Sequence, residues 1–295
     1  METPKQQFLD VDRLLESSEV QTRGNYLPLI FGVVVLLTFM VGQALADAMQ
    51  ASPGVVTALK LAVMTGVLIG VSSFSVSSLR RYQRQQLLLQ SIDELMHLRR
   101  WPEAGTSLER LLSRPARLPQ VRVQALIYLG GVLSRYHRYT DAIRVYEYVL
   151  EQVRLDAPTD LSIRIGRAMA MLHEDHLVDA DRAISELRRH PAGGASGAVA
   201  LVEIYRDVKT GHMDDAIRLA IEKRDPIRLQ LGHRCGDVHA LVARAYDVLN
   251  QPEAAQKSYR AATLLQPEVE LQRRYAEVAR LAGKYAPAQQ PQGDA

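Results

Sequence analysis

The sequence predicts an all-α protein, in which an N-terminal transmembrane hairpin of two helices precedes an α-solenoid of about five helix pairs. Residues 27–46 and 61–79 contain no charged side chain. Each stretch comes close to spanning roughly 30 Å of bilayer hydrocarbon at about 1.5 Å per residue. After residue 80, small residues recur at a nearly constant interval, and no segment shows the alternation of a strand.

Residues 1–25 are predicted to be a cytoplasmic leader with one short amphipathic helix. The stretch FLDVDRLLESSEV places apolar side chains on roughly one side of such a helix. These are Phe8, Leu9, Val11, Leu14 and Leu15. The helix can lie on the membrane surface or pack on the main domain, and the sequence leaves both placements open.

Residues 26–79 are predicted to form the hairpin, with spans at about 27–46 and 57–79. A buried helix of a soluble protein is one alternative, but such a helix normally shows a polar edge, and the first span offers only Thr38 and Gln43. A cleavable signal peptide is another, because Ala44 and Ala46 stand before Asp47 as in a cleavage site. The long, acidic leader argues against it, yet whether the first span is cleaved stays open.

The orientation follows from basic residues near the spans, because Lys and Arg resist translocation. Arg80, Arg81 and Arg84 follow the second span, whereas the loop DAMQASPG contains neither Lys nor Arg. We therefore expect a multi-pass protein of a bacterial-type inner (plasma) membrane with both termini and the repeats in the cytoplasm. The three arginines are expected to meet anionic lipid headgroups, each adding about 1 kcal/mol near the surface.

Residues 80–285 carry the repeat. One alanine recurs at intervals of 38, 38, 36 and 39 residues, the signature of stacked helical units. Small residues let paired helices approach closely, and a ring four residues after the alanine fills the gap toward the next unit. The residues assigned to this packing are Ala104, Gly130, Ala142, Tyr146, Ala180, Ala216, Ala255 and Tyr259.

The units resemble tetratricopeptide repeats, a family of antiparallel helix pairs about 34 residues long. The best copy, LIYLGGVLSRYHRYTDAIRVYEYVL, has Leu126, Leu129, Gly130 and Leu133 on its first helix and Tyr139, Ala142, Tyr146 and Val149 on its second. The last copy ends at Pro267, where the family often places its closing proline. The tail 286–295 is rich in proline and glutamine and is expected to be disordered.

No arrangement of residues indicates catalysis, a metal or a cofactor. His173 and His176 lie three apart, but no third ligand is evident; Cys235 and His239 lack a third group that would make a nucleophile. The sequence therefore predicts a protein that is not an enzyme. The charge is nearly balanced, with 36 basic and 33 acidic residues, and no basic and aromatic motif indicates nucleic-acid binding.

Surface binding remains as the role. Stacked helix pairs form a curved groove lined by the first helices, which usually holds a peptide or a partner's helix. The resemblance places an apolar row and two flanking charges in that groove: Ile127, Ile165, Met169, Leu201 and Tyr205, with Arg135 and Arg244. That these residues instead pack internally is an equal alternative.

We therefore expect a membrane-tethered scaffold or adaptor that binds a protein or peptide partner at the cytoplasmic face. Its layout, two spans followed by repeats, is similar to that of HemY-type membrane proteins, and this similarity makes a subunit or regulator of an envelope or biosynthetic enzyme complex the first alternative. A metal-dependent enzyme that uses His173 and His176 is a further alternative, which the sequence favours less. A third alternative is self-association of the repeats into a homo-oligomer. The identity of the partner is not encoded in any readable motif.

Overall fold

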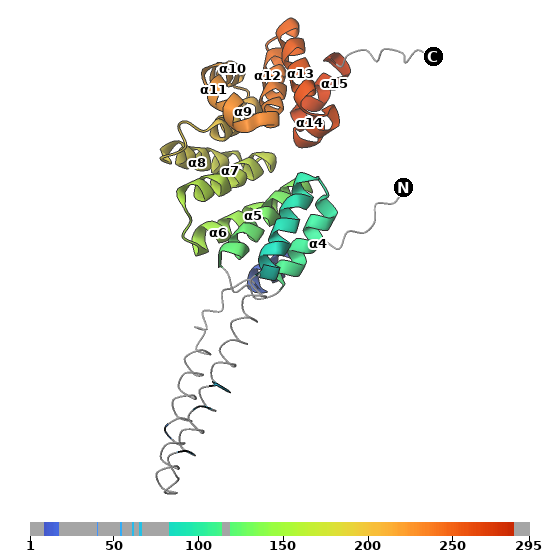
Figure 1. Cartoon of the computed structure of the whole chain (residues 1–295). Coiled ribbons are helices and arrows are strands. Elements are labelled where there is room, and N and C mark those ends of the chain that lie inside the picture. Colours follow the sequence, from blue (N-terminus) through green and yellow to red (C-terminus); the bar gives the residue numbers. More distant parts are fainter. Residues whose placement is uncertain are drawn as a thin grey trace, which may run out of the picture. The chain divides into compact units, whose positions relative to one another are not determined.

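The computed structural model describes residues 9–17, 40, 54, 61, 65–66, 83–113 and 119–285 (Figure 1). Within these ranges every regular element is a helix and no strand occurs, so the all-α prediction is confirmed. Apart from isolated positions, the predicted spans, Arg80, Arg81 and the tail lie outside the described residues. Among the helices that are described, none is long and apolar enough to cross a membrane.

The chain divides into two compact units, residues 1–128 and 129–295, with the boundary inside the segment predicted as one repeat domain. The first unit contains α1 (Val11–Ser17), a helix over residues 83–97, α4 (Trp101–Leu112) and the first part of α5 (Pro119–Arg135). Val11 and Leu14 are buried and α1 contacts α4, so the leader helix packs on the repeat region. Arg84 is exposed on the helix over residues 83–97.

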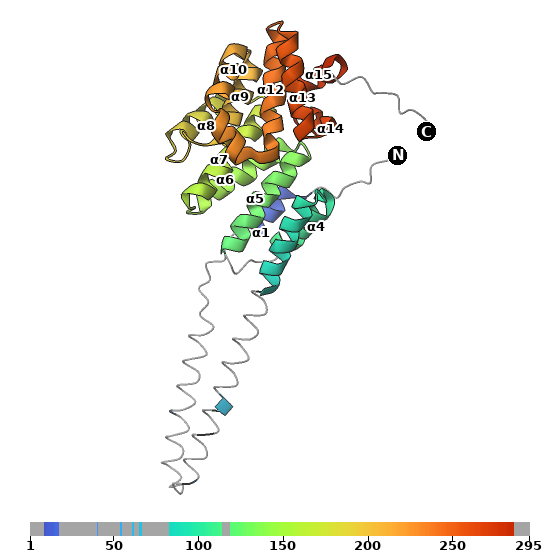
Figure 2. The same cartoon turned by 45° about the horizontal axis from the view of Figure 1, so that its top comes forward.

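The second unit continues from the end of α5 through a series of helix pairs (Figure 2). Its first helices α7, α9 and α12 contact one another in order, and each also contacts its own second helix. The elements are α6 (Tyr139–Gln152), α7 (Ala157–His173), α8 (Leu177–Arg189), α9 (Gly197–Thr210), α10 (Met213–Glu222), α11 (Arg224–Leu231), α12 (Cys235–Val248), α13 (Pro252–Leu265), α14 (Glu268–Arg274) and α15 (Ala279–Tyr285).

The turn inside each pair repeats one backbone geometry. A residue with positive φ reverses the chain five residues before the recurring alanine, and these residues are Arg99 (58°), His137 (58°), Asp175 (60°), Gly211 (85°) and Asn250 (55°). In the best copy, the next amide, Arg138 N, donates to Leu133 O at 3.0 Å, and Ala142 N donates to Arg138 O at 3.0 Å. The left-handed turn residues therefore recur at the same interval as the alanines.

The packing residues of the repeat are buried. All five recurring alanines and Tyr259 are fully inaccessible to solvent. The Tyr146 ring lies between glycines of two successive first helices: a Cβ on Gly130 would stand 2.5 Å from Tyr146 Cε1, and one on Gly166 would stand 2.9 Å from Cζ. The ring thus joins neighbouring pairs, and Gly166 is a partner that the sequence analysis did not identify.

Candidate functional site

The most distinctive feature of the second unit is its C-terminal segment, residues 268–285, which comprises α14, a 3-10 turn at Ala276–Val278, and α15. Gln266 and Pro267 are extended and redirect the chain after α13. The segment then runs beside α12 and α13 (Figure 2). Four apolar side chains of the segment are fully buried: Leu271, Tyr275, Val278 and Leu281. The segment therefore packs on the helix pairs through one apolar face.

Equivalent positions of three successive first helices receive this segment. Arg135, His173 and Lys209 each stand two residues before the left-handed residue of their pair. Each meets a different residue of the segment: Arg135 Nη2 is 2.5 Å from Glu270 Oε1, the His173 and Tyr275 rings are 5.9 Å apart, and Lys209 Nζ is 3.5 Å from Glu277 Oε1. The segment therefore crosses the helix pairs in sequence order. We call Arg135, His173, Tyr205, Lys209 and Asp237 the receiving surface.

Rings form the centre of the receiving surface. His173 stacks on Tyr139 with ring centroids 4.6 Å apart and tilts against Tyr205 at 5.0 Å, while Tyr275 meets Tyr205 edge-on at 5.0 Å. The Tyr205 hydroxyl lies 3.1 Å from His173 Nδ1 and donates to Glu277 Oε1 at 3.5 Å. Tyr205 and Tyr275 are 1% and 0% exposed, whereas Tyr139 and His173 are half-buried, so the contact between Tyr205 and the segment is the enclosed part of this cluster.

A buried ionic network anchors the segment next to Tyr275. Both carboxylate oxygens of Asp237 accept from Arg274 Nη1, at 2.5 and 2.6 Å, and Asp237 is 0% exposed. Arg234 Nε and Gln266 Nε2 each donate to the same carboxylate at 3.1 Å. This network fixes the path of the segment, because losing the Arg274 contact would remove the shorter of the two ion pairs that compensate a fully buried carboxylate.

The far end of the segment meets the last described helix pair. Asp247 Oδ1 accepts from Lys284 Nζ at 2.5 Å and from the Tyr285 hydroxyl at 2.9 Å, while Arg244 Nη1 donates to Asp247 Oδ2 at 3.1 Å. Burial acts to raise the pKa of Asp247, but the hydrogen bonds from Lys284 and Tyr285 outweigh it and lower the pKa. Asp247 is therefore held ionised at this junction.

Burial, followed by the positive charge of Lys209, lowers the pKa of His173 to about 4. The imidazole is therefore neutral in the folded protein at neutral pH. An unfolded chain, with the ordinary pKa of 6.5, binds more protons between pH 6.5 and 4 than the folded chain does. The contribution of His173 to the free energy of unfolding consequently falls as the pH drops through this window.

We expect the wild-type protein to lose up to about 1.4 kcal/mol of stability per pH unit between pH 6.5 and 4, relative to a His173→Gln variant. Urea unfolding of both proteins, followed by circular dichroism at several pH values, measures the difference. Other titrating groups cancel in this comparison. Parallel pH profiles of the two proteins would show that His173 is not held neutral.

The predicted binding residues fall into three environments. Arg135 and Tyr205 contact the C-terminal segment, and Arg244 contacts Asp247, to which the segment binds. Leu201 is buried, at 2% exposure, on α9. Ile165 and Met169 are half-buried on α7, and Ile127 is half-buried in the first unit. Whether these side chains contact a partner stays a prediction.

The residues that the sequence offers for catalysis or metal binding have different environments in the structure. His173 belongs to the ring cluster while His176 is exposed. Burial raises the pKa of the Cys235 thiol, which donates to Ile227 O at 3.3 Å. Within the described ranges, no group of three His, Cys, Asp or Glu residues is arranged to hold a metal ion.

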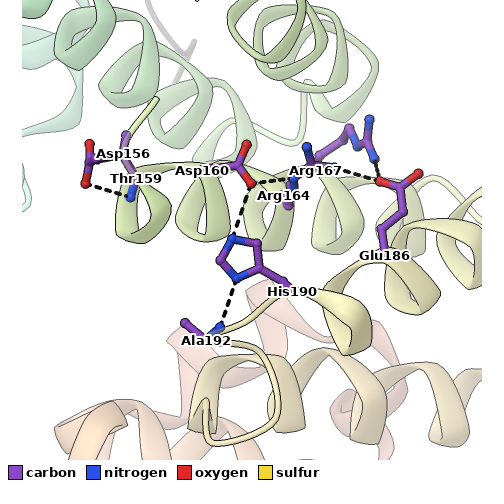
Figure 3. A network of polar contacts seen from close by, with 8 residues as sticks. All are labelled: Asp156, Thr159, Asp160, Arg164, Arg167, Glu186, His190 and Ala192. Atoms are coloured by element: carbon purple, nitrogen blue, oxygen red, sulfur yellow. Dashed lines mark hydrogen bonds and ion pairs between the residues drawn. The ribbon is translucent and has the colours of Figure 1, made fainter. Parts of the chain in front are cut away.

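A second polar network lies between α7 and α8 (Figure 3). Glu186 Oε2 accepts from Arg164 Nη1 and Arg167 Nη2, each at 2.9 Å, and Arg164 Nε donates to Asp160 at 2.6 Å. His190 Nε2 lies 3.5 Å from Asp160, and its Nδ1 accepts from the Ala192 amide at 3.2 Å. These contacts tie the second helix of a pair, and the glycine-containing turn after it, to the first helix, which is a structural role.

Comparisons of the chain with protein-family models, with curated proteins and with solved structures give no match in any of the three. The tetratricopeptide likeness therefore rests on the residue pattern. What the geometry offers chemically is a set of ion pairs, hydrogen bonds and ring contacts along successive helix pairs. These are the interactions by which one protein segment binds another.

Proposed function

We propose that the protein is a membrane-tethered, tetratricopeptide-like adaptor that binds a segment of another protein on the receiving surface. One observation carries the proposal: a segment of the chain itself lies on this surface and meets equivalent positions of three successive first helices. A surface with ionic and aromatic positions at a regular interval suits an elongated polypeptide better than a small molecule.

The tether is the predicted hairpin at residues 26–79, with the repeats at the cytoplasmic face and Arg80, Arg81 and Arg84 next to the lipid headgroups. Its support is the charge-free composition of the two spans and the basic residues that follow them. Confining the receiving surface near the bilayer raises the effective concentration of a membrane-associated partner without any covalent step. Carbonate extraction of cell membranes should leave the intact chain in the pellet.

The partner is tested by affinity capture of the full-length chain from detergent-solubilised membranes. Neutralising two cations of the receiving surface, Arg135→Gln with Lys209→Gln, should reduce recovery of the specific partner at least several-fold. The control is Lys257→Gln on α13, where the lysine is exposed. Equal recovery with all three proteins would rule out this surface as the site.

A further inference from the structure

We infer that the C-terminal segment is an intramolecular competitor of the partner, and that the partner carries the same recognition pattern: an acid, a cation four residues later, a tyrosine directly after it, and a second acid two residues after the tyrosine. In this chain these positions are Glu270, Arg274, Tyr275 and Glu277. The inference rests on the proposed function and adds to it the chemistry of the partner and a mode of regulation.

We infer the two acids of the pattern from the cations of the receiving surface with which Glu270 and Glu277 form ion pairs. Arg135 and Glu270 form an ion pair whose side chains are only 15% and 20% exposed, and Lys209 and Glu277 are similarly shielded, at 11% and 22%. Solvent screens such partly buried pairs less than surface pairs. A competing segment without acids at these two positions would lose these two partly buried ion pairs.

We infer the cation and the tyrosine of the pattern from the two most buried contacts of the segment, Arg274 with Asp237 and Tyr275 with Tyr205. Asp237 is completely buried, so an occupant without a positive group at the place of Arg274 would leave this carboxylate with the longer Arg234 contact, at 3.1 Å, in place of a pair at 2.5 Å. Tyr275 fills the space beside Tyr205 and His173, where a smaller side chain would leave a void. Together these two contacts make the middle of the pattern the most selective part.

Release of the segment leaves the helix pairs with their own packing. The Tyr146 ring lies between Gly130 and Gly166, and the recurring alanines are buried between paired helices. α14 and α15 have seven residues each, too few for helices that persist alone in water. The segment should therefore detach at a lower free energy than global unfolding, by movement at the extended Gln266 and Pro267.

The test measures exchange between the bound segment and an added copy of it. The receptor is the full-length chain carrying Glu270→Lys and Glu277→Lys, which weakens the internal segment and leaves the receiving surface intact. The probe is a fluorescent synthetic peptide of residues 266–285 with the natural sequence. We expect the double variant to bind the probe at least about tenfold more tightly than the wild type does, because the internal competitor is weakened.

Two controls define the specificity of the exchange. A peptide carrying Tyr275→Ala should bind at least tenfold more weakly, and adding Lys209→Gln to the receptor should weaken the natural peptide. Should the double variant be unfolded by circular dichroism, hydrogen exchange of wild-type protein with excess peptide replaces it. Faster exchange at residues 268–285 would then support displacement, and unchanged exchange at millimolar peptide would overturn the inference.

The outcomes separate this inference from the proposed function. Peptide exchange without capture of a membrane partner would contradict only the proposed function. Capture of a partner without peptide exchange would contradict only the inference that the C-terminal segment competes with the partner. A concentration-dependent dimer of the double variant, abolished by added peptide, would assign the surface to a second copy of the chain and overturn the assignment to a different protein.

Discussion

Replacing Asp237 with alanine is expected to lower the free energy of unfolding by about 3–5 kcal/mol. The carboxylate is fully buried and accepts hydrogen bonds from Arg274, Arg234 and Gln266. Its removal leaves the Arg274 guanidinium, whose side chain is 28% exposed, without its main counter-charge. Urea unfolding of the full-length protein in detergent, followed by circular dichroism, measures the loss.

A double substitution distinguishes two causes of this loss: the unpaired charge of Arg274 and the lost packing of the Asp237 side chain. In Asp237→Leu with Arg274→Met, both charges disappear and the space stays filled, so the loss should be well below that of Asp237→Ala. Hydrogen exchange should also show residues 268–285 released in Asp237→Ala. A loss under 1 kcal/mol in the single variant would mean that the network does not anchor the segment.

Replacing Gly130 with alanine is expected to destabilise the protein by about 1–3 kcal/mol through overpacking. The new methyl would stand 2.5 Å from Tyr146 Cε1 and 2.6 Å from Cζ. The ring cannot move away freely, because Gly166 stands on its other side, where a Cβ would lie 2.9 Å from Cζ. Gly166→Ala should have a smaller effect of the same sign.

The same packing gives a rescue experiment. Tyr146→Leu removes the distal ring atoms, so adding Gly130→Ala to this variant should cost less than adding it to the wild type. The difference is a coupling energy between contacting residues, expected at about 0.5–3 kcal/mol. Gly194→Ala is the control, since a Cβ there would meet nothing within 4 Å. Identical melting of Gly130→Ala and Gly194→Ala would contradict the wedge arrangement.

The repeat could be predicted from sequence because its signal is local and periodic. A buried alanine is needed wherever two helices approach closely, so Ala142 and its equivalents recur at the interval of the structural unit. The left-handed turn residues recur at the same interval, but they were not identified because most are not glycine. Gly166 could have been found, since it follows Gly130 by 36 residues, within the range of the repeat.

The receiving surface could be predicted only in part. The resemblance to tetratricopeptide repeats predicts Arg135 and Tyr205 at the groove, but nothing local in the sequence indicates that the chain's own C-terminal segment covers them. Arg135 and Glu270 are separated by 135 residues, and complementary charges at such a distance have many alternative pairings. Asp237 and Arg274 were missed for the same reason, since burial of an ion pair depends on the tertiary fold.

Site-specific photo-cross-linking in cells tests most directly whether the receiving surface binds another protein. A photoreactive phenylalanine analogue at Met169, half-buried on α7 one turn before His173, is compared with the same analogue at Leu264, exposed on α13. We expect Met169 to give a discrete cross-linked product of higher mass that contains a second protein, and Leu264 to give none. Cross-links from Leu264 alone, or only within the chain from Met169, would contradict a partner site on this surface.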